Sequence, residues 1–162
     1  MWEYDVRKRT IQRLECVVVL CGGMRTNMDA GQKKAVARGT ETVLLVDDES
    51  VVRKFMRRVL EAHGYRVLDA GSGDDAMQVA RRYGKRIDLL LTDDVLPGIQ
   101  GTEVIRQFRE LRPGVPALRM SGYPEHLGEY QDQGVRYLGK PFSSERLLVR
   151  VREILDTTAA AA

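Results

Sequence analysis

The chain has 162 residues, of which 43% are hydrophobic and 30% charged, and this suits one domain with an ordinary buried core. Its pI of about 9.0 could indicate a nucleic-acid partner, but the basic residues are concentrated at one end. Residues 1–39 contain eight Lys or Arg and four Asp or Glu; because the whole chain has a net charge of +3, the rest carries −1. A nearly neutral body argues against direct nucleic-acid binding.

We interpret residues 1–39 as a basic leader or linker of low order, since the stretch from Asn27 to Thr40 is polar, contains glycine and lacks periodicity. Neither Cys16 nor Cys21 has a Cys or His neighbour at a metal-ligand spacing, so both are expected to be free thiols in a reducing cytoplasm. The apolar run between them is far shorter than the roughly 20 residues that cross a bilayer. We therefore predict a cytoplasmic protein with no membrane partner.

From Thr42 onward, short aliphatic runs of strand length alternate with longer amphipathic stretches of helical period. This alternation predicts an α/β fold, in which a doubly wound, five-stranded parallel sheet has helices on both faces. The expected strands are Thr42–Asp47, Tyr65–Ala70, Ile87–Asp93, Val115–Met120 and Val135–Gly139.

Five helices are expected between and after these strands. In the first, apolar residues recur at helical spacing from Val51 to Leu60, and His63-Gly64 follows, with glycine where a left-handed cap is needed. The others are expected from the cap Ser72 to Arg82, from Thr102 to Leu111, from Pro124, and from the cap Ser143 to Leu155. We therefore place the folded domain at residues 40–156, followed by an Ala-rich tail over residues 157–162.

Polar residues stand at the carboxyl ends of the expected strands. In an open parallel sheet the binding crevice lies outside those ends, so the functional site is expected there. The pairs at the ends of the first, third, fourth and fifth strands are Asp47-Asp48, Asp93-Asp94, Ser121-Gly122 and Lys140-Pro141.

These residue types together indicate phosphoryl chemistry. The carboxylates of Asp47, Asp48 and Asp93 would repel one another in a single pocket, and a bound cation relieves that repulsion. Mg²⁺ suits such a site because it accepts one or two carboxylates and leaves room for phosphate oxygens. Lys140 would add a fixed positive charge and Ser121 a hydroxyl donor. One of the carboxylates could then attack phosphorus, and the product would be an acyl phosphate on aspartate.

Four motifs occur in a characteristic order, and together they closely resemble the response-regulator receiver family of two-component signalling. The resemblance covers roughly Glu41–Leu155 and is greatest to receivers of hybrid sensor histidine kinases and to single-domain response regulators. It implies a flavodoxin-like (βα)₅ fold with strand order 2-1-3-4-5. The motifs are Val43-Leu-Leu-Val-Asp-Asp-Glu49, Leu91-Thr-Asp-Asp-Val-Leu-Pro-Gly98, Met120-Ser-Gly-Tyr123 and Gly139-Lys-Pro-Phe142.

The resemblance implies that Asp93 is the phosphoacceptor, since it stands four residues before Pro97 as in the family's pattern. It also implies that Mg²⁺ is bound by the carboxylates of Asp48 and Asp93, by Asp47 largely through water, and by the backbone carbonyl of Val95.

The resemblance assigns phosphate contacts to Lys140 and Ser121, and it makes Ser121 and Tyr137 the switch residues. It also implies a cis peptide bond between Lys140 and Pro141. The chain departs from the family's commonest residues at Leu96, where methionine is frequent, and at Asp94, which adds an acid beside the acceptor.

The implied function is a phosphorylation-dependent signalling switch rather than a turnover enzyme, with chemistry limited to phosphorylation and dephosphorylation of Asp93. A histidine kinase or histidine phosphotransfer protein would be the phosphodonor. Phosphorylation would change the surface formed by the fourth helix, fifth strand and fifth helix. The output would pass through a downstream partner or a homodimer. The chain could be a stand-alone regulator or a piece of a hybrid kinase.

Two alternative functions share part of this pattern. A Mg²⁺-dependent phosphatase of the haloacid-dehalogenase type is suggested by Asp47-x-Glu49, but that family places its lysine before its late acidic pair, whereas Lys140 follows Asp93-Asp94. A flavodoxin-like flavin carrier would need a phosphate-binding loop after the first strand, where acids stand here. Each motif alone also has an ordinary structural explanation, such as a helix cap or a turn.

Overall fold

The computed structural model describes residues 38–122 and 135–160. Predictions about the leader up to residue 37, the helix expected from Pro124, and residues 161–162 therefore lie outside the described residues. Within the described residues, none of the helices is both long enough and apolar enough to cross a membrane.

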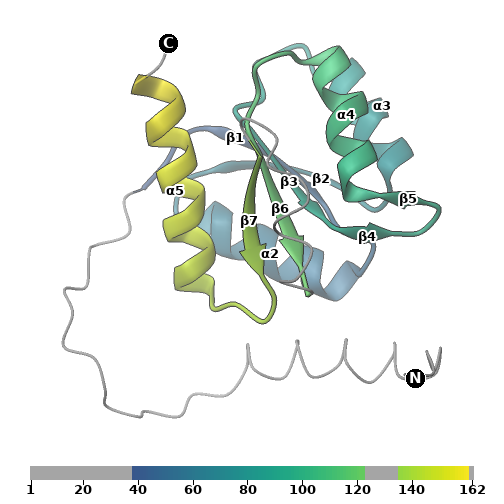
Figure 1. Cartoon of the computed structure of the whole chain (residues 1–162). Coiled ribbons are helices and arrows are strands. Elements are labelled where there is room, and N and C mark those ends of the chain that lie inside the picture. Colours follow the sequence, from purple (N-terminus) through teal and green to yellow (C-terminus); the bar gives the residue numbers. More distant parts are fainter. Residues whose placement is uncertain (1–37, 123–134, 161–162) are drawn as a thin grey trace, which may run out of the picture. The chain divides into compact units, whose positions relative to one another are not determined.

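Five parallel strands form the central sheet in the order β2-β1-β3-β6-β7 (Figure 1). Their bounds are β1 Thr42–Val46, β2 Arg66–Ala70, β3 Leu89–Asp93, β6 Ala117–Ser121 and β7 Val135–Gly139. This is the predicted order 2-1-3-4-5, because two short strands, β4 and β5, lie between β3 and β6 along the chain. The doubly wound α/β fold is confirmed.

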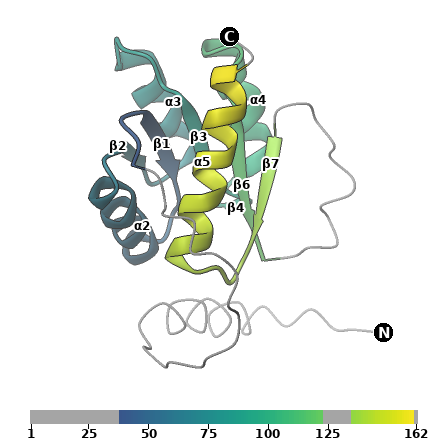
Figure 2. The ribbon, with the colours of Figure 1, turned by 90° about the vertical axis from the view of Figure 1, so that its left-hand side faces the viewer.

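The described helices lie on both faces of the sheet, α2 and α5 on one and α3 and α4 on the other (Figures 1 and 2). They span α2 Ser50–Ala62, α3 Gly73–Arg82, α4 Gly101–Leu111 and α5 Ser144–Ala160. Most predicted bounds differ from these by one or two residues. The larger difference is at the end of α5, where Thr157 and Thr158 bond to carbonyls one turn back and alanines, the best helix formers, follow. This helix continues four residues beyond the predicted domain end.

Local capping explains where several helices begin and end. The Ser72 hydroxyl accepts a hydrogen bond from the Asp75 amide at 3.1 Å, and the Ser143 hydroxyl accepts one from the Arg146 amide at 3.2 Å. Gly64 follows α2 with a φ of 95°, the left-handed conformation that glycine adopts without a steric penalty. These three predicted caps are confirmed.

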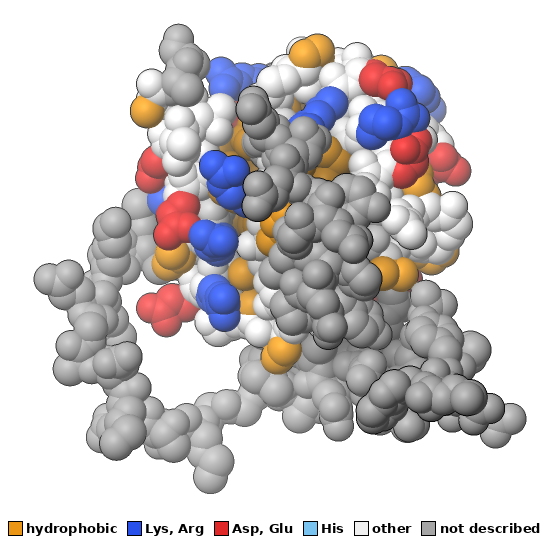
Figure 3. Space-filling model, viewed as in Figure 1, with side chains coloured by type: hydrophobic (Ala, Val, Ile, Leu, Met, Phe, Trp, Pro, Cys, Tyr) orange, Lys and Arg blue, Asp and Glu red, His pale blue; other side chains and the backbone are white. Residues whose placement is uncertain are grey.

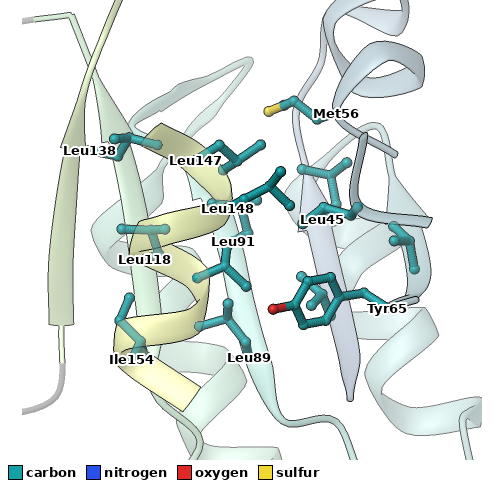
Figure 4. Close-up of a cluster of buried hydrophobic side chains, with 14 of the residues drawn as sticks. Leu45, Met56, Tyr65, Leu89, Leu91, Leu118, Leu138, Leu147, Leu148 and Ile154 are labelled. Carbon is teal, nitrogen blue, oxygen red and sulfur yellow. The ribbon is translucent and has the colours of Figure 1, made fainter. Parts of the chain in front are cut away.

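Each face of the sheet has its own hydrophobic cluster. Alternate residues of β1 point to opposite faces, so Val43 and Leu45 pack on one side, and Leu44 and Val46 on the other. Figure 4 shows the first cluster, in which α2 and α5 close over the sheet; its labelled residues are Leu45, Met56, Tyr65, Leu89, Leu91, Leu118, Leu138, Leu147, Leu148 and Ile154. Burial on both faces explains why these strands are nearly continuous apolar runs.

A short hairpin follows β3 and is not among the elements predicted from the sequence. β4 (Val95–Leu96) and β5 (Ile99–Gln100) pair antiparallel across Pro97-Gly98. Gly98 has a φ of 76°, as the third residue of a type II turn requires. Strands of two residues carry no periodic signal, which explains why the hairpin is missing from the prediction.

The start of α4 is pressed against the end of β3. The Gly101 amide donates to the Asp94 carbonyl at 2.8 Å, and a Cβ atom on Gly101 would lie only 2.3 Å from the Asp93 carbonyl oxygen. The hairpin and this glycine therefore hold the backbone at the carboxyl end of β3 in place.

Charged side chains of both signs are interspersed over α4 and along α5 on the face seen in Figure 3. Arg106 on α4 lies between Glu103 and Glu110, and Arg150 on α5 pairs with Glu153. This mixture agrees with the nearly neutral charge of the chain after residue 39.

Candidate functional site

Three carboxylates converge at the carboxyl edge of the sheet. One oxygen from each of Asp47, Asp48 and Asp93 lies within 4.8 Å of the other two. Asp47 follows β1 and Asp93 ends β3, and these strands are parallel neighbours, so their carboxyl ends meet. Asp47 is 1% exposed and Asp93 8% exposed. The residues that the sequence places at strand ends thus form one acidic cluster, of which Asp47 and Asp93 are buried.

The ionised form of the Asp47 carboxylate is disfavoured by its surroundings. Its Oδ1 accepts a hydrogen bond from the Glu49 amide at 2.9 Å, whereas its buried Oδ2 accepts none from the described residues. Burial raises its pKa to about 6; the charges of Asp93 and Asp48 add to the rise, and Lys140 opposes it. A buried carboxylate oxygen that lies near two further carboxylates is suited to act as a ligand of a cation.

Lys140 directly follows β7 and reaches the acidic cluster. Its Nζ lies 3.0 Å from Asp93 Oδ2 and 3.7 Å from Asp47 Oδ2. Its own amide donates to the Ser121 carbonyl at 2.7 Å, and the peptide bond to Pro141 is cis. The lysine therefore places a positive charge beside two of the three acids.

Asp93 makes two different contacts through its carboxylate. Oδ2 faces Lys140, while Oδ1 accepts a hydrogen bond from the Asp94 amide at 2.8 Å. The same amide donates to the Met120 carbonyl at 2.8 Å, which continues the pairing of β3 with β6. The carboxylate is thus oriented by the backbone and partnered by one lysine.

Ser121 lies at the end of β6 and is 2% exposed. Its hydroxyl donates to Asp94 Oδ2 at 3.0 Å, so in this arrangement it is bound to the neighbour of the expected acceptor. Val95 opens β4 with 42% of its residue surface exposed, two positions beyond Asp93. The role of its backbone carbonyl toward a metal stays a prediction.

Two arginines belong to the surroundings of the site and are absent from the sequence prediction. Arg119, in β6, is 2% exposed; its Nε lies 3.1 Å from Asp94 Oδ1, and its guanidinium carbon lies 4.7 Å from the centre of the Tyr137 ring. Arg53, in α2, donates to the Asp47 carbonyl at 2.5 Å. A signal for Arg119 exists in the sequence, since a charge inside an apolar strand needs a buried partner.

The fold and the site define a class of protein: a doubly wound α/β domain with an acidic cluster and a neighbouring lysine at the carboxyl edge of its sheet. Residues 43–152 match the family described as the response regulator receiver domain. The chain belongs to this family.

Curated relatives agree with this assignment. Sensor kinase CckA of Brucella abortus (strain 2308) is 34% identical over 128 residues, which cover 77% of this chain and 14% of that protein. The probable transcriptional regulatory protein TcrX of Mycobacterium tuberculosis is 33% identical over 120 residues, which cover 72% of this chain and 50% of that protein. The chain therefore spans half or less of the length of these relatives.

Solved structures of receiver domains are also similar. The receiver domain of the hybrid histidine kinase CckA is 35% identical with a TM-score of 0.62, covering 70% of this chain and 98% of that one. The chemotaxis response regulator CheY4 of Vibrio cholerae is 28% identical with a TM-score of 0.64, covering 72% and 99%.

Receiver domains are switches of two-component signalling rather than classical enzymes. The comparisons do not support the haloacid-dehalogenase alternative that Asp47-x-Glu49 suggests. The order of the site residues along the chain favours the same choice.

Proposed function

We propose that Asp93 accepts a phosphoryl group from a histidine kinase or a histidine phosphotransfer protein, and that this phosphorylation is the signal. The observation that carries the proposal is the position of its carboxylate, 3.0 Å from the Lys140 ammonium and grouped with two further acids. Asp94 points its carboxylate to Ser121 and Arg119 instead, which supports Asp93 rather than Asp94 as the acceptor.

The donor set of the acidic cluster fits Mg²⁺, which prefers carboxylate and carbonyl oxygens. Asp47, Asp48 and Asp93 would hold it, with the carbonyl of Val95 as a further ligand. When bound, Mg²⁺ supplies positive charge to the oxygens of the transferring phosphoryl group. It would also offset the repulsion that contributes to the raised pKa of Asp47.

The residues of this chain then have separate tasks in the transfer. A bond forms between phosphorus and an Asp93 carboxylate oxygen as the bond from phosphorus to the donor's imidazole nitrogen breaks, and that nitrogen keeps the electron pair. Lys140 lies where it can neutralise charge on the phosphoryl oxygens. The backbone contacts of Asp94 and Gly101 keep the carboxylate in position. The product is an aspartyl phosphate.

The new group adds a charge of about −1.5 to −2 next to Ser121. The Ser121 hydroxyl would turn to the phosphoryl oxygens, and Tyr137 would change position with it. Ser121 is the last residue of β6 and Tyr137 lies within β7, so the change would reach the surface of β7 and α5. The helix expected from Pro124, which lies outside the described residues, would belong to the same surface. A downstream partner or a second copy of the chain would recognise that surface.

The proposed function also has consequences for the cellular compartment and for the residue range of the domain. Partnership with a histidine kinase places the domain in the cytoplasm, where reduced Cys16 and Cys21 are also expected. The functional domain would comprise residues 40–156, with residues 1–39 as a linker.

Intact mass spectrometry after incubation with acetyl phosphate and Mg²⁺ tests the central assignment. The wild-type chain should gain one phosphoryl group, and Asp93→Asn should gain none. The matched control is Asp156→Asn, because that side chain is 65% exposed on α5 and pairs with Arg152. Labelling that survives in Asp93→Asn would sink the assignment, and repeated turnover of a simple phosphate ester would favour a phosphatase.

A further inference from the structure

We propose that Asp94 and Arg119 are positioning residues that link the Ser121 hydroxyl to the Tyr137 ring and hold both in the unphosphorylated arrangement. The inference rests on the proposed function, because it concerns the step that follows phosphorylation of Asp93. It assigns roles to two residues that have no part in the phosphoryl transfer itself.

The four side chains form a continuous series that starts at β6, includes the residue that follows β3, and ends on β7. The Ser121 hydroxyl donates to Asp94 Oδ2 at 3.0 Å, and the other oxygen of Asp94 lies 3.1 Å from Arg119 Nε. The Arg119 guanidinium lies 4.7 Å from the Tyr137 ring centre. Arg119 and Tyr137 are direct partners in the register of β6 and β7, which explains their side-by-side placement.

Burial makes the ion pair a fixed element rather than a surface contact. The side chain of Arg119 is 3% exposed and that of Asp94 is 19% exposed, so neither charge is well solvated. A buried guanidinium needs a countercharge, and the aromatic face of Tyr137 adds a second favourable contact. Asp94 and Arg119 therefore depend on each other for their positions.

The Ser121 hydroxyl has a single proton to donate. It is donated here to a carboxylate, and hydrogen bonds to charged acceptors are the stronger kind. A phosphoryl group on Asp93 would compete for the same proton, so Ser121 must leave Asp94 before it can bind that group. Asp94 therefore opposes the switch.

The same acid also restrains Tyr137 through Arg119. A turn of the ring must break its contact with a guanidinium that is ion-paired with Asp94. When Ser121 leaves Asp94, both carboxylate oxygens become available to Arg119, and the guanidinium can move toward them. Asp94 thus couples the movement of the Ser121 hydroxyl to the movement of the Tyr137 ring.

The rate of labelling by acetyl phosphate with Mg²⁺ tests the link in four proteins: wild type, Asp94→Asn, Ser121→Ala and the double variant. Asp94→Asn keeps the shape but weakens the acceptor, so we expect labelling about tenfold faster than wild type. In the Ser121→Ala background the same substitution should change the rate by less than about twofold. A tenfold effect of Asp94→Asn that persists in the Ser121→Ala background would mean that Asp94 acts by charge alone, and this would overturn the link. The link would also be overturned if Asp94→Asn changed the rate in neither background.

The position of Tyr137 gives a readout that a purely electrostatic effect would not move. In protein labelled with 3-fluorotyrosine, the ¹⁹F resonance of Tyr137 is assigned by its loss in Tyr137→Phe. Without phosphodonor, Asp94→Asn should shift this resonance toward its position in the phosphorylated wild type. Glu103→Gln is the matched control, since Glu103 is also paired with an arginine but lies on the surface of α4. Coincident resonances in Asp94→Asn and wild type would overturn the proposal.

Two further measurements separate this inference from the proposed function and from misfolding. If wild type is labelled at Asp93 but the rates of the four proteins are additive, the link fails and the phosphoacceptor assignment stands. If Asp94→Asn does not fold, the double variant Asp94→Val with Arg119→Leu removes both buried charges. Its Tyr137 resonance should shift toward the phosphorylated position, and an unshifted resonance would overturn the link.

Discussion

The amino and carboxyl edges of the sheet differ in how their charged side chains are arranged. At the amino edge, Arg152 Nη2 lies 2.7 Å from Glu41 Oε1, and the Asp88 carboxylate accepts the Thr42 amide at 2.8 Å while pairing with Arg86. At the carboxyl edge, three acids cluster, and Lys140 lies beside two of them, Asp47 and Asp93. At the amino edge, which has a structural role, acids are paired with arginines. At the carboxyl edge, which is proposed to bind a cation and a phosphoryl group, like charges lie close together.

The pKa values of the acids follow this difference. Burial alone would raise the pKa of Glu41, but the hydrogen bond from Arg152 and two backbone amides bring it below its usual value. Burial raises the pKa of Asp47 to about 6, and neighbouring carboxylates add to the rise. One edge therefore stabilises the ionised form of its acid, and the other edge destabilises it. Perturbed acids in a crevice are typical of functional sites.

Without divalent metal, ionisation of Asp47 should have the largest effect on stability. Between its ordinary pKa of 3.8 and about 6, the folded chain keeps a proton that the unfolded chain has released. The contribution of Asp47 to the free energy of unfolding therefore falls as pH rises through this window, by up to about 3 kcal/mol. Urea unfolding of wild type and Asp47→Asn at pH 4 to 7.5 measures it. We expect the free energy of unfolding of Asp47→Asn to rise relative to that of wild type as pH rises. Parallel pH profiles of the two proteins would contradict the idea that ionised Asp47 destabilises the folded chain.

Mg²⁺ should reverse most of that loss in the wild type. At pH 7.5 and free Mg²⁺ at one hundred times its dissociation constant, binding adds about 2.7 kcal/mol to the free energy of unfolding. Thermal melts with and without Mg²⁺ check this, and the gain should be smaller at pH 5, where Asp47 is protonated. Asp47→Asn and Asp93→Asn should lose the gain while Glu41→Gln keeps it. Equal gains in all four proteins would place the metal elsewhere.

A methyl group on Gly101 should disturb the carboxyl edge through the backbone alone. The new Cβ of Gly101→Ala would lie 2.3 Å from the Asp93 carbonyl oxygen, so the end of β3 or the start of α4 must shift. We expect a loss of about 1–3 kcal/mol in the free energy of unfolding and slower labelling of Asp93. Gly84→Ala is the matched control, because its Cβ would have no neighbour within 4 Å. Unchanged labelling in Gly101→Ala would show that the acceptor does not depend on this contact.

Much of both edges could be predicted from the sequence, because strands and caps carry local signals. Residues at strand ends, such as Asp47 and Asp93, could be brought together by the topology of a parallel sheet alone. The pairing of Asp94 with Arg119 could not, since it depends on which face of β6 the arginine occupies and on a neighbour 25 positions away. The β4–β5 hairpin was also missed, because two residues are too few for a period to appear.

The amino edge should respond with the opposite pH dependence and no effect on the proposed chemistry. Glu41→Gln removes the charge that Arg152 pairs with, and both side chains are mostly buried, so we expect a loss of about 1 kcal/mol at pH 7. Because the folded-state pKa of Glu41 is lowered, its contribution is present above its ordinary pKa and is lost as pH falls through the folded value. In urea unfolding at pH 3 to 7, the free energies of unfolding of wild type and Glu41→Gln should therefore become more similar as pH falls. That of Asp47→Asn should instead rise relative to wild type as pH approaches neutrality. Labelling of Asp93 should be the same in Glu41→Gln and wild type, since an altered rate would mean that the two edges are coupled through the sheet.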